Sequence, residues 1–151
     1  MGISYCLCPL SAKRLALLEE DPELVNELTE DAVPDMLDLG PDGFALDGIL
    51  VFAGRSSAIR DAVFAHGGHQ LGEPGNTARV HSAARVVEIH EALEALPEDV
   101  IARHYEEAKR AVAQLESGFA SLTHLTRLFE DLRAVYAKAA VDRQGMLTFL
   151  V

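Results

Sequence analysis

A long amphipathic segment near the C-terminus, residues 121–140, constrains the fold of this chain more than any other feature. Its apolar side chains recur every three or four residues, the spacing that gathers them on one face of an α-helix. That face consists of Leu122, Leu125, Leu128, Phe129, Leu132, Val135, Tyr136 and Ala139, with Arg127, Glu130, Asp131, Arg133 and Lys138 opposite. We therefore predict a helix that buries this face in the core.

Short apolar runs near both ends of the sequence predict two buried strands. Residues 2–9 carry β-forming and small apolar side chains on both faces, and residues 145–151 have the same character. Either strand alone would leave a row of backbone N–H and C=O groups without partners. We expect the two runs to pair in one sheet.

The residues between these runs predict several helices and one hairpin. Residues 61–72 have the pattern of a hairpin that turns at Gly67-Gly68. Residues 44–53 are largely apolar, and periodicity does not distinguish a buried helix from a buried strand there. The expected fold is α+β: a single domain over residues 1–151, with a small mixed sheet including both termini and a central hairpin, packed with about five helices. Four positions suit helix starts, as caps or as a proline in the first turn: Ser11, Asp21, Ser82 and Pro97.

The charge of the chain limits its partners. Its 151 residues include 24 acidic and 13 basic side chains, which gives a formal net charge of −11. Binding to nucleic acid or to an anionic membrane depends on Lys and Arg, so neither partner is expected. No segment has the length and apolarity of a membrane span or resembles a signal peptide, and Cys6 and Cys8 are poorly placed to form a disulfide. We expect a cytoplasmic protein with reduced thiols and no cofactor.

Two histidines flank the predicted turn, in the sequence His66-Gly67-Gly68-His69. Residues on either side of a two-residue turn face each other, close enough to share a metal ion. A catalytic zinc site usually needs three protein ligands, and Glu73 and His81 are the nearest candidates for the third. His66, His69 and His81 are thus candidate metal ligands. The alternative is that the two flanking histidines are polar residues at an exposed hairpin tip.

Residues 19–38 contain many carboxylates and no Lys or Arg. Such a segment can be the solvated face of two helices, or it can dock a basic protein. An inhibitor or immunity-like protein directed against a nuclease would use a surface of this kind. Glu23, Glu27 and Glu30 are the candidate contacts for this partner.

Several short motifs follow one another along the chain. The sequence starts with Met1-Gly2 and a nearby Tyr5, and Leu37-Asp38-Leu39 precedes an apolar segment that ends at Gly54. Leu71-Gly72 ends the predicted hairpin, a capped helix starts near residue 82, and the last amphipathic helix leads into an apolar strand. Together these motifs resemble the YfbM-like family, a bacterial domain of unknown function. The resemblance implies a mixed α and β single domain and no known activity.

The chain departs from that family's pattern in two segments. The family tends to place a Trp and a following His after the Leu-Asp-Leu motif, whereas this sequence has no Trp and has Phe44 and Leu50 nearby. The connection from Tyr105 to Ser121 also lacks the family's usual proline. A site formed by those positions in relatives would therefore not carry over to this chain.

The sequence contains no complete catalytic motif. Gly-x-Ser-x-Gly, a phosphate-binding loop and a dinucleotide-binding fingerprint are all missing. The function predicted from sequence is therefore a non-catalytic binding or regulatory protein, of which an inhibitor is one form. The alternative is a small metal-dependent enzyme that uses the histidines of the hairpin.

Overall fold

The two ends of the chain pair at the centre of the sheet. In this computed structural model, which describes residues 4–28, 33, 35–54, 56–63, 68–71, 78–111 and 120–150, β1 (Tyr5–Leu10) lies antiparallel to β5 (Gly145–Leu150). The register runs without interruption from Tyr5 opposite Leu150 to Leu10 opposite Gly145. The predicted pairing of the terminal strands is confirmed.

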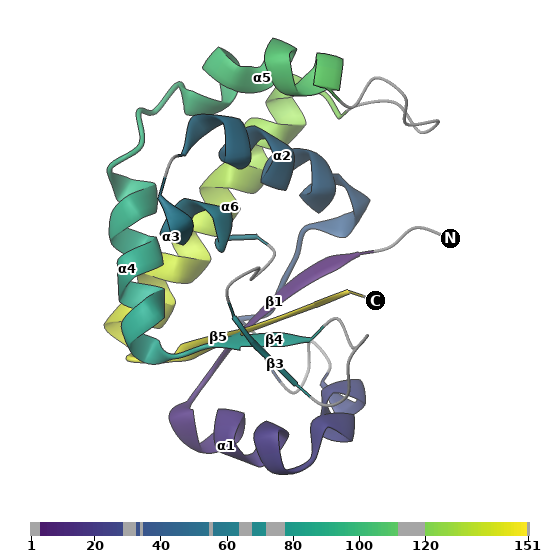
Figure 1. The fold of residues 1–151 in the computed structure, drawn as a ribbon, viewed down its shortest axis with the longest axis vertical. Coiled ribbons are helices and arrows are strands. Elements are labelled where there is room, and N and C mark those ends of the chain that lie inside the picture. Colours follow the sequence, from purple (N-terminus) through teal and green to yellow (C-terminus); the bar gives the residue numbers. More distant parts are fainter. Residues whose placement is uncertain are drawn as a thin grey trace.

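Three shorter strands complete the sheet on either side of this pair (Figure 1). The order is β2-β1-β5-β4-β3, where β2 is Leu37–Asp38, β3 is His69–Gln70 and β4 is Arg79–His81. All four pairings among the described strands are antiparallel, so they do not form the mixed sheet that the sequence predicts.

The hairpin differs from the one expected for residues 61–72. Strand β3 pairs with β4, and Asp61–Val63 form a turn at the end of helix α3 (Ser57–Arg60). The Ser56 side chain caps this helix by accepting a hydrogen bond from the backbone N–H of Ile59. Ala62 and Val63 are buried because they continue the apolar face of α3, so their β-like character indicated the wrong element.

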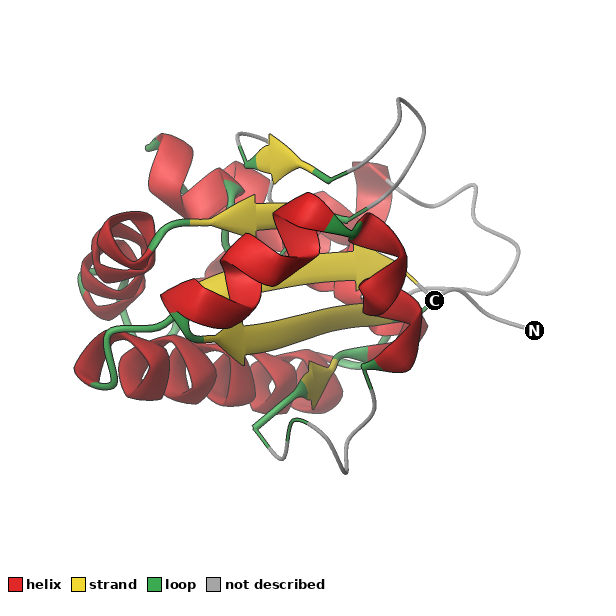
Figure 2. Ribbon diagram, turned by 90° about the horizontal axis from the view of Figure 1, so that it is seen from below, coloured by secondary structure: helices red, strands yellow, loops and turns green. Residues whose placement is uncertain are grey.

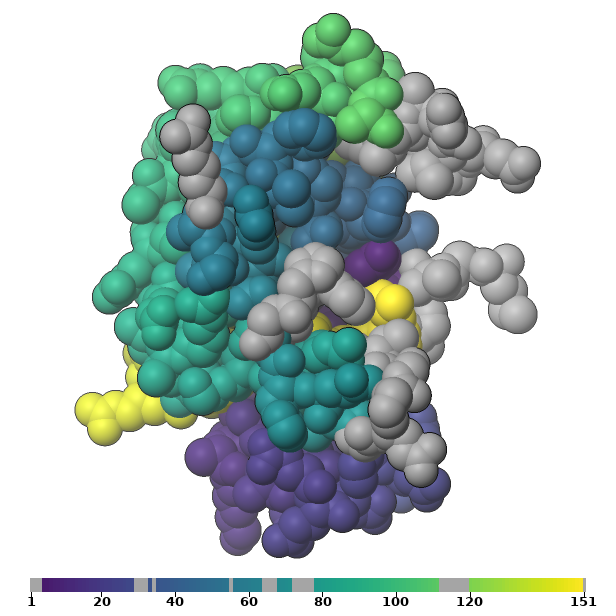
Figure 3. Space-filling model, in the orientation of Figure 1, coloured from purple at the N-terminus to yellow at the C-terminus, as the bar shows by residue number. Residues whose placement is uncertain are grey.

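Helices cover the two faces of the sheet unequally (Figures 1 and 2). The larger layer contains α2 (Gly43–Ala53), α3, α4 (Ala83–Glu94), α5 (Val100–Ala111) and α6 (Leu122–Val141). The opposite face carries α1 (Ala12–Glu20) and the 3₁₀ helix η1 (Pro22–Glu27), and a second short 3₁₀ helix, η2 (Gly40–Asp42), precedes α2. In Figure 3, α1 and η1 form one end of the molecule and α5 the other.

Alternation along the central strands divides the core in two. Leu7 and Met146 point into the larger helical layer, while Cys8, Leu147 and Phe149 pack with α1 and η1 on the other face. Through its pairing with β5, strand β4 has the same alternation, which places His81 on the face of the larger helical layer.

Helix α6 is the core element that its periodicity predicts. Ser121 caps its start through a hydrogen bond from the backbone N–H of His124, and the apolar face is buried from Leu125 to Ala139. Leu122 is the exception, because it lies in the first turn and is 37% exposed. The segment of ambiguous periodicity is also helical and forms α2, whose first residue, Gly43, packs directly against Tyr5. None of the described helices has the length and hydropathy needed to cross a bilayer.

Candidate functional site

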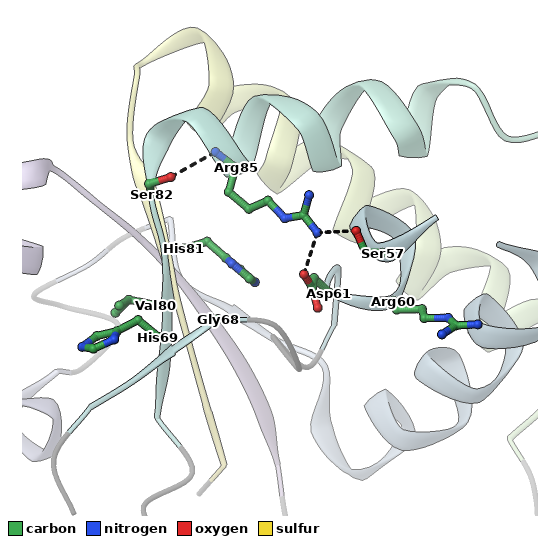
Figure 4. Close-up of a pocket in the computed structure, with 9 residues that line it drawn as sticks. All are labelled: Ser57, Arg60, Asp61, Gly68, His69, Val80, His81, Ser82 and Arg85. Atoms are coloured by element: carbon green, nitrogen blue, oxygen red, sulfur yellow. Dashed lines mark hydrogen bonds and ion pairs between the residues drawn. The ribbon is translucent and has the colours of Figure 1, made fainter. Parts of the chain in front are cut away.

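A polar cleft of about 630 Å³ opens where α3 and the start of α4 meet the edge strands β3 and β4 (Figure 4). This volume lies in the range of pockets that hold small molecules. Its described lining comes from α3 and the turn after it, from β3 and the residue before it, from β4, and from the start of α4. These residues are Ser57, Arg60, Asp61, Gly68, His69, Val80, His81, Ser82 and Arg85.

An ion pair forms the inner wall of the cleft. Nη2 of Arg85 lies 2.8 Å from Oδ2 of Asp61, whose side chain is only 5% exposed. The same guanidinium donates hydrogen bonds to Ser57 Oγ and to the Glu88 carboxylate, both at 2.9 Å. The hydrogen bond to the Asp61 side chain is the main cause that raises the pKa of Arg85. A buried carboxylate is stable only with such a partner, so this pair fixes α3 against α4.

The start of α4 aims Arg85 into the cleft. Ser82 accepts a hydrogen bond from the Arg85 backbone N–H at 3.2 Å and so caps the helix directly after strand β4. This tight strand-to-helix connection places His81, the last residue of β4, beside the first turn of α4. In Figure 4 the side chains of His81, Asp61, Arg85 and Ser57 converge, whereas Arg60 and His69 point away from them.

His81 is the buried titratable group of the cleft, with 3% of its surface exposed. Burial lowers its pKa; the nearby Asp61 charge and a hydrogen bond to the Asp61 backbone act in the opposite direction, and Arg85 lowers the pKa further. Among the described residues, its Nε2 atom has no hydrogen-bond partner. Nδ1–H of His81 is therefore the atom that donates the hydrogen bond to the Asp61 backbone. In the neutral ring Nε2 is then a hydrogen-bond acceptor.

The candidate metal ligands are not brought together by the described residues. His69 lies opposite Val80 in the register of β3 and β4, so its side chain is on the Val80 face of the sheet. His81 lies opposite Met146, on the face of the large helical layer. His66 and Glu73 lie outside the described residues. Over the part of the chain that is described, no three side chains of His, Cys, Asp or Glu form a cluster that could hold a metal ion.

The acidic candidates lie on the opposite side of the sheet from the cleft. Glu23 and Glu27 are exposed on η1, and Glu30 lies outside the described residues. Glu27 borders a second, smaller pocket of about 250 Å³ between α1 and η1. We call this pocket the α1–η1 groove; its lining is mostly apolar and consists of Leu10, Arg14, Leu17, Leu18, Leu24, Glu27 and Leu28.

The other described histidines and the two cysteines lie outside the cleft. His90 and His104 are half-buried, and Nε2 of the exposed His124 lies 2.9 Å from Oδ2 of Asp42. Cys6 and Cys8 are buried thiols, and burial raises the pKa of the Cys8 thiol to about 12. Neither thiol has the electropositive, accessible surroundings of a reactive cysteine.

Asp61, Arg85 and Ser57 are site residues that the sequence did not predict. Asp61 and Arg85 are 24 residues apart and belong to no short motif. One weak signal was available: Asp61 is the only acidic residue between Asp47 and Glu73, in a segment whose other residues are mostly small or apolar. A lone carboxylate there suggests a specific partner, but it does not name Arg85.

The antiparallel sheet between a large and a small helical layer defines the fold class, a two-sided α+β domain. A family model of a domain of unknown function, DUF1877, matches residues 1–149, and the chain belongs to this family. The solved structure of YfbM from Escherichia coli, a protein of unknown function, is similar over 99% of each chain, with a TM-score of 0.67 and 16% identity. The expected YfbM-like family and its fold are thereby confirmed. The search of curated proteins finds no match.

Proposed function

We propose that residues 1–151 form one domain that acts as a non-catalytic binding or regulatory protein, and that its site is the polar cleft. The observation that carries this proposal is the Nε2 atom of His81, a lining residue of the cleft: it is a buried acceptor without a partner among the described residues. A buried polar atom left without a hydrogen bond destabilises the folded state by about 1–3 kcal/mol. A ligand that donates to this atom recovers that free energy on binding.

The ion pair supports binding over catalysis. A general acid or base must be able to exchange its proton during the reaction. The Asp61 carboxylate and the Arg85 guanidinium neutralise each other at 2.8 Å, and the surroundings of Arg85 raise its pKa further above neutrality. This pair supplies a rigid, charged wall that can orient a ligand.

A thermal-shift screen of small polar compounds tests the proposal. A ligand that binds only the folded state raises the Tm in proportion to its concentration over Kd. We expect compounds that raise the Tm of the wild-type protein and lose this effect in Ser57→Trp, which places a large side chain at the cleft. Thr123→Trp is the matched control, since Thr123 is also exposed in the first turn of a helix but lies outside the cleft. Stabilisation that persists in Ser57→Trp would contradict the proposal.

The α1–η1 groove supports a second function, the docking of a basic amphipathic helix from a partner protein. Leu17 lines this apolar groove and is 48% exposed, Glu27 lines its η1 side, and Glu23 is exposed on the same 3₁₀ helix. Such a helix would place apolar side chains in the groove and Lys or Arg beside the carboxylates. An inhibitor of a basic enzyme is one protein that would work in this way.

The metal-dependent enzyme on His66, His69 and His81 is the remaining alternative. The placement of His69 and His81 on opposite faces of the sheet argues against a shared ion. Elemental analysis of purified protein tests it, and we expect no stoichiometric zinc. One zinc per chain that is lost in His69→Ala would establish the enzyme alternative in place of the binding function.

A further inference from the structure

We infer that the ligand of the polar cleft is a small hydroxylated anion, such as a polyhydroxy carboxylate or a sugar phosphate. This inference rests on the proposed binding function and adds the chemical class of the ligand. It follows from the donors, the acceptor and the charge that the lining residues present.

The wall around Arg85 offers hydrogen-bond donors. The guanidinium uses three of its five N–H groups on Asp61, Ser57 and Glu88, so N–H groups remain for a ligand. Ser57 Oγ and Ser82 Oγ accept hydrogen bonds from Arg85, and their own O–H groups are left to donate. Several convergent donors suit the oxygens of a carboxylate or phosphate.

The charges around the cleft are balanced, within a chain of net charge −11. Two arginines and one aspartate line the cleft, and the Glu88 carboxylate pairs with Arg85 beside them. Asp61 does not repel an anion as an isolated charge would, because its carboxylate is buried against Arg85. The cleft thus repels an anion less than the acidic remainder of the chain does.

A second wall, formed by His81 beside Arg85, offers an acceptor (Figure 4). Nε2 of the neutral His81 ring can only accept a hydrogen bond, so the ligand must place a donor there. A hydroxyl group supplies that donor without adding a positive charge next to Arg85. A ligand that satisfies both walls therefore combines an anionic group with at least one hydroxyl.

The size of the cleft indicates more than an inorganic ion. A volume of about 630 Å³ is large for phosphate or sulfate alone and suits an organic molecule. Four acyclic probes of six carbons separate the two requirements: gluconate carries carboxylate and hydroxyls, sorbitol 6-phosphate carries phosphate and hydroxyls, hexanoate lacks hydroxyls, and sorbitol lacks the charge.

Isothermal titration of the wild-type protein with these probes tests the inference. We expect gluconate, sorbitol 6-phosphate or both to bind at least about tenfold more tightly than hexanoate and sorbitol, because each of the latter leaves one wall unsatisfied. Ser57→Ala should weaken the tighter probe by about threefold or more, whereas Ser11→Ala, at a helix start on the other face of the sheet, should not change it. The relative affinity of the two anions then identifies carboxylate or phosphate as the preferred group.

Equal affinity for all four probes, or tighter binding of sorbitol or hexanoate, would overturn the inference. So would affinity for the hydroxylated anions that Ser57→Ala leaves unchanged. If the thermal-shift screen finds compounds that bind the cleft while gluconate and sorbitol 6-phosphate do not bind, the ligand class is wrong and the proposed binding function stands. If no compound in either experiment binds the cleft, both are wrong.

Discussion

The Arg85 guanidinium and the Asp61 carboxylate lie 2.8 Å apart at the inner wall of the cleft, although 24 residues separate them in the sequence. Asp61 follows α3 and Arg85 belongs to the first turn of α4, so the pair joins the two helices beside His81. The ion pair therefore links the stability of this part of the fold to the geometry of the proposed site.

Removing the charge of Asp61 should destabilise the protein. Asp61→Asn leaves the half-buried Arg85 guanidinium with only the exposed Glu88 carboxylate as a charged partner, and we expect a loss of about 1.5–3 kcal/mol in the free energy of unfolding. Asp99→Asn is the matched control, because Asp99 also lies 2.8 Å from an arginine, Arg103, but both side chains are more than half exposed. Asp99→Asn should lower the free energy of unfolding, measured by urea denaturation, by less than about 1 kcal/mol. Equal losses would show that burial adds nothing to the Asp61 pair.

The face of α6 makes a second prediction. Leu125→Ala and Leu132→Ala should each lower the free energy of unfolding by about 2–5 kcal/mol, because both side chains are fully buried in the larger core. Arg127→Ala, on the exposed side of the same helix, should change it by less than about 0.5 kcal/mol. Chemical denaturation measures the free energy of unfolding of all three variants. Similar losses at the three positions would show that α6 does not bury the face that contains Leu125 and Leu132.

His81 should make stability depend on pH. Burial lowers its pKa in the folded state below the ordinary value of 6.5, so the unfolded chain takes up this proton first as the pH falls. The stabilisation is fully present above pH 6.5 and is lost between 6.5 and the lower folded-state pKa, by up to about 1.4 kcal/mol per pH unit.

Denaturation at pH 7.5 and 5.5 measures this effect. His81→Gln should show a smaller loss of stability on acidification than the wild-type protein. The same pH dependence in both proteins would place the responsible group elsewhere.

The groove makes a prediction about salt. If the α1–η1 groove docks a basic helix, charge reversal by Glu23→Lys with Glu27→Lys should abolish binding of a synthetic basic amphipathic peptide, and added salt should weaken binding to the wild type. Glu130→Lys, an exposed carboxylate on α6, is the control and should leave binding intact. Fluorescence titration that finds binding insensitive to both salt and charge reversal would refute the docking role.

Local sequence patterns correctly predicted those helices and strands whose pattern of apolar residues lies within a single element. The periodicity of residues 121–140 indicated α6, and the continuous apolar runs at the two ends indicated β1 and β5, because each pattern lies within one element. The hairpin prediction was wrong for Ala62 and Val63, since two small or β-branched residues suit the end of a short helix as well as a strand. Deciding between them depends on packing in the larger core, where both residues are buried, and no local window of sequence contains that packing.

The proposed site was not predictable in the same way. Asp61, His81 and Arg85 come from the end of α3, the end of β4 and the start of α4, and they meet only when these elements pack together. His69 and His81 are candidate ligands of one metal ion by sequence, and the register of β3 with β4 places their side chains on opposite faces of the sheet. A shift of one residue in that register would reverse the face of His69, and the sequence contains nothing that fixes it.

The most direct test of the proposed binding site is the NMR signal of the His81 imidazole, recorded as the ¹⁵N shifts of its two ring nitrogens in labelled protein. We predict that gluconate or another compound selected by the thermal-shift screen moves the Nε2 signal of His81 as this atom gains a hydrogen bond, while the imidazole of His124, outside the cleft, does not move. A selected compound that stabilises the protein without changing the His81 signal would contradict the assignment of the cleft as the site.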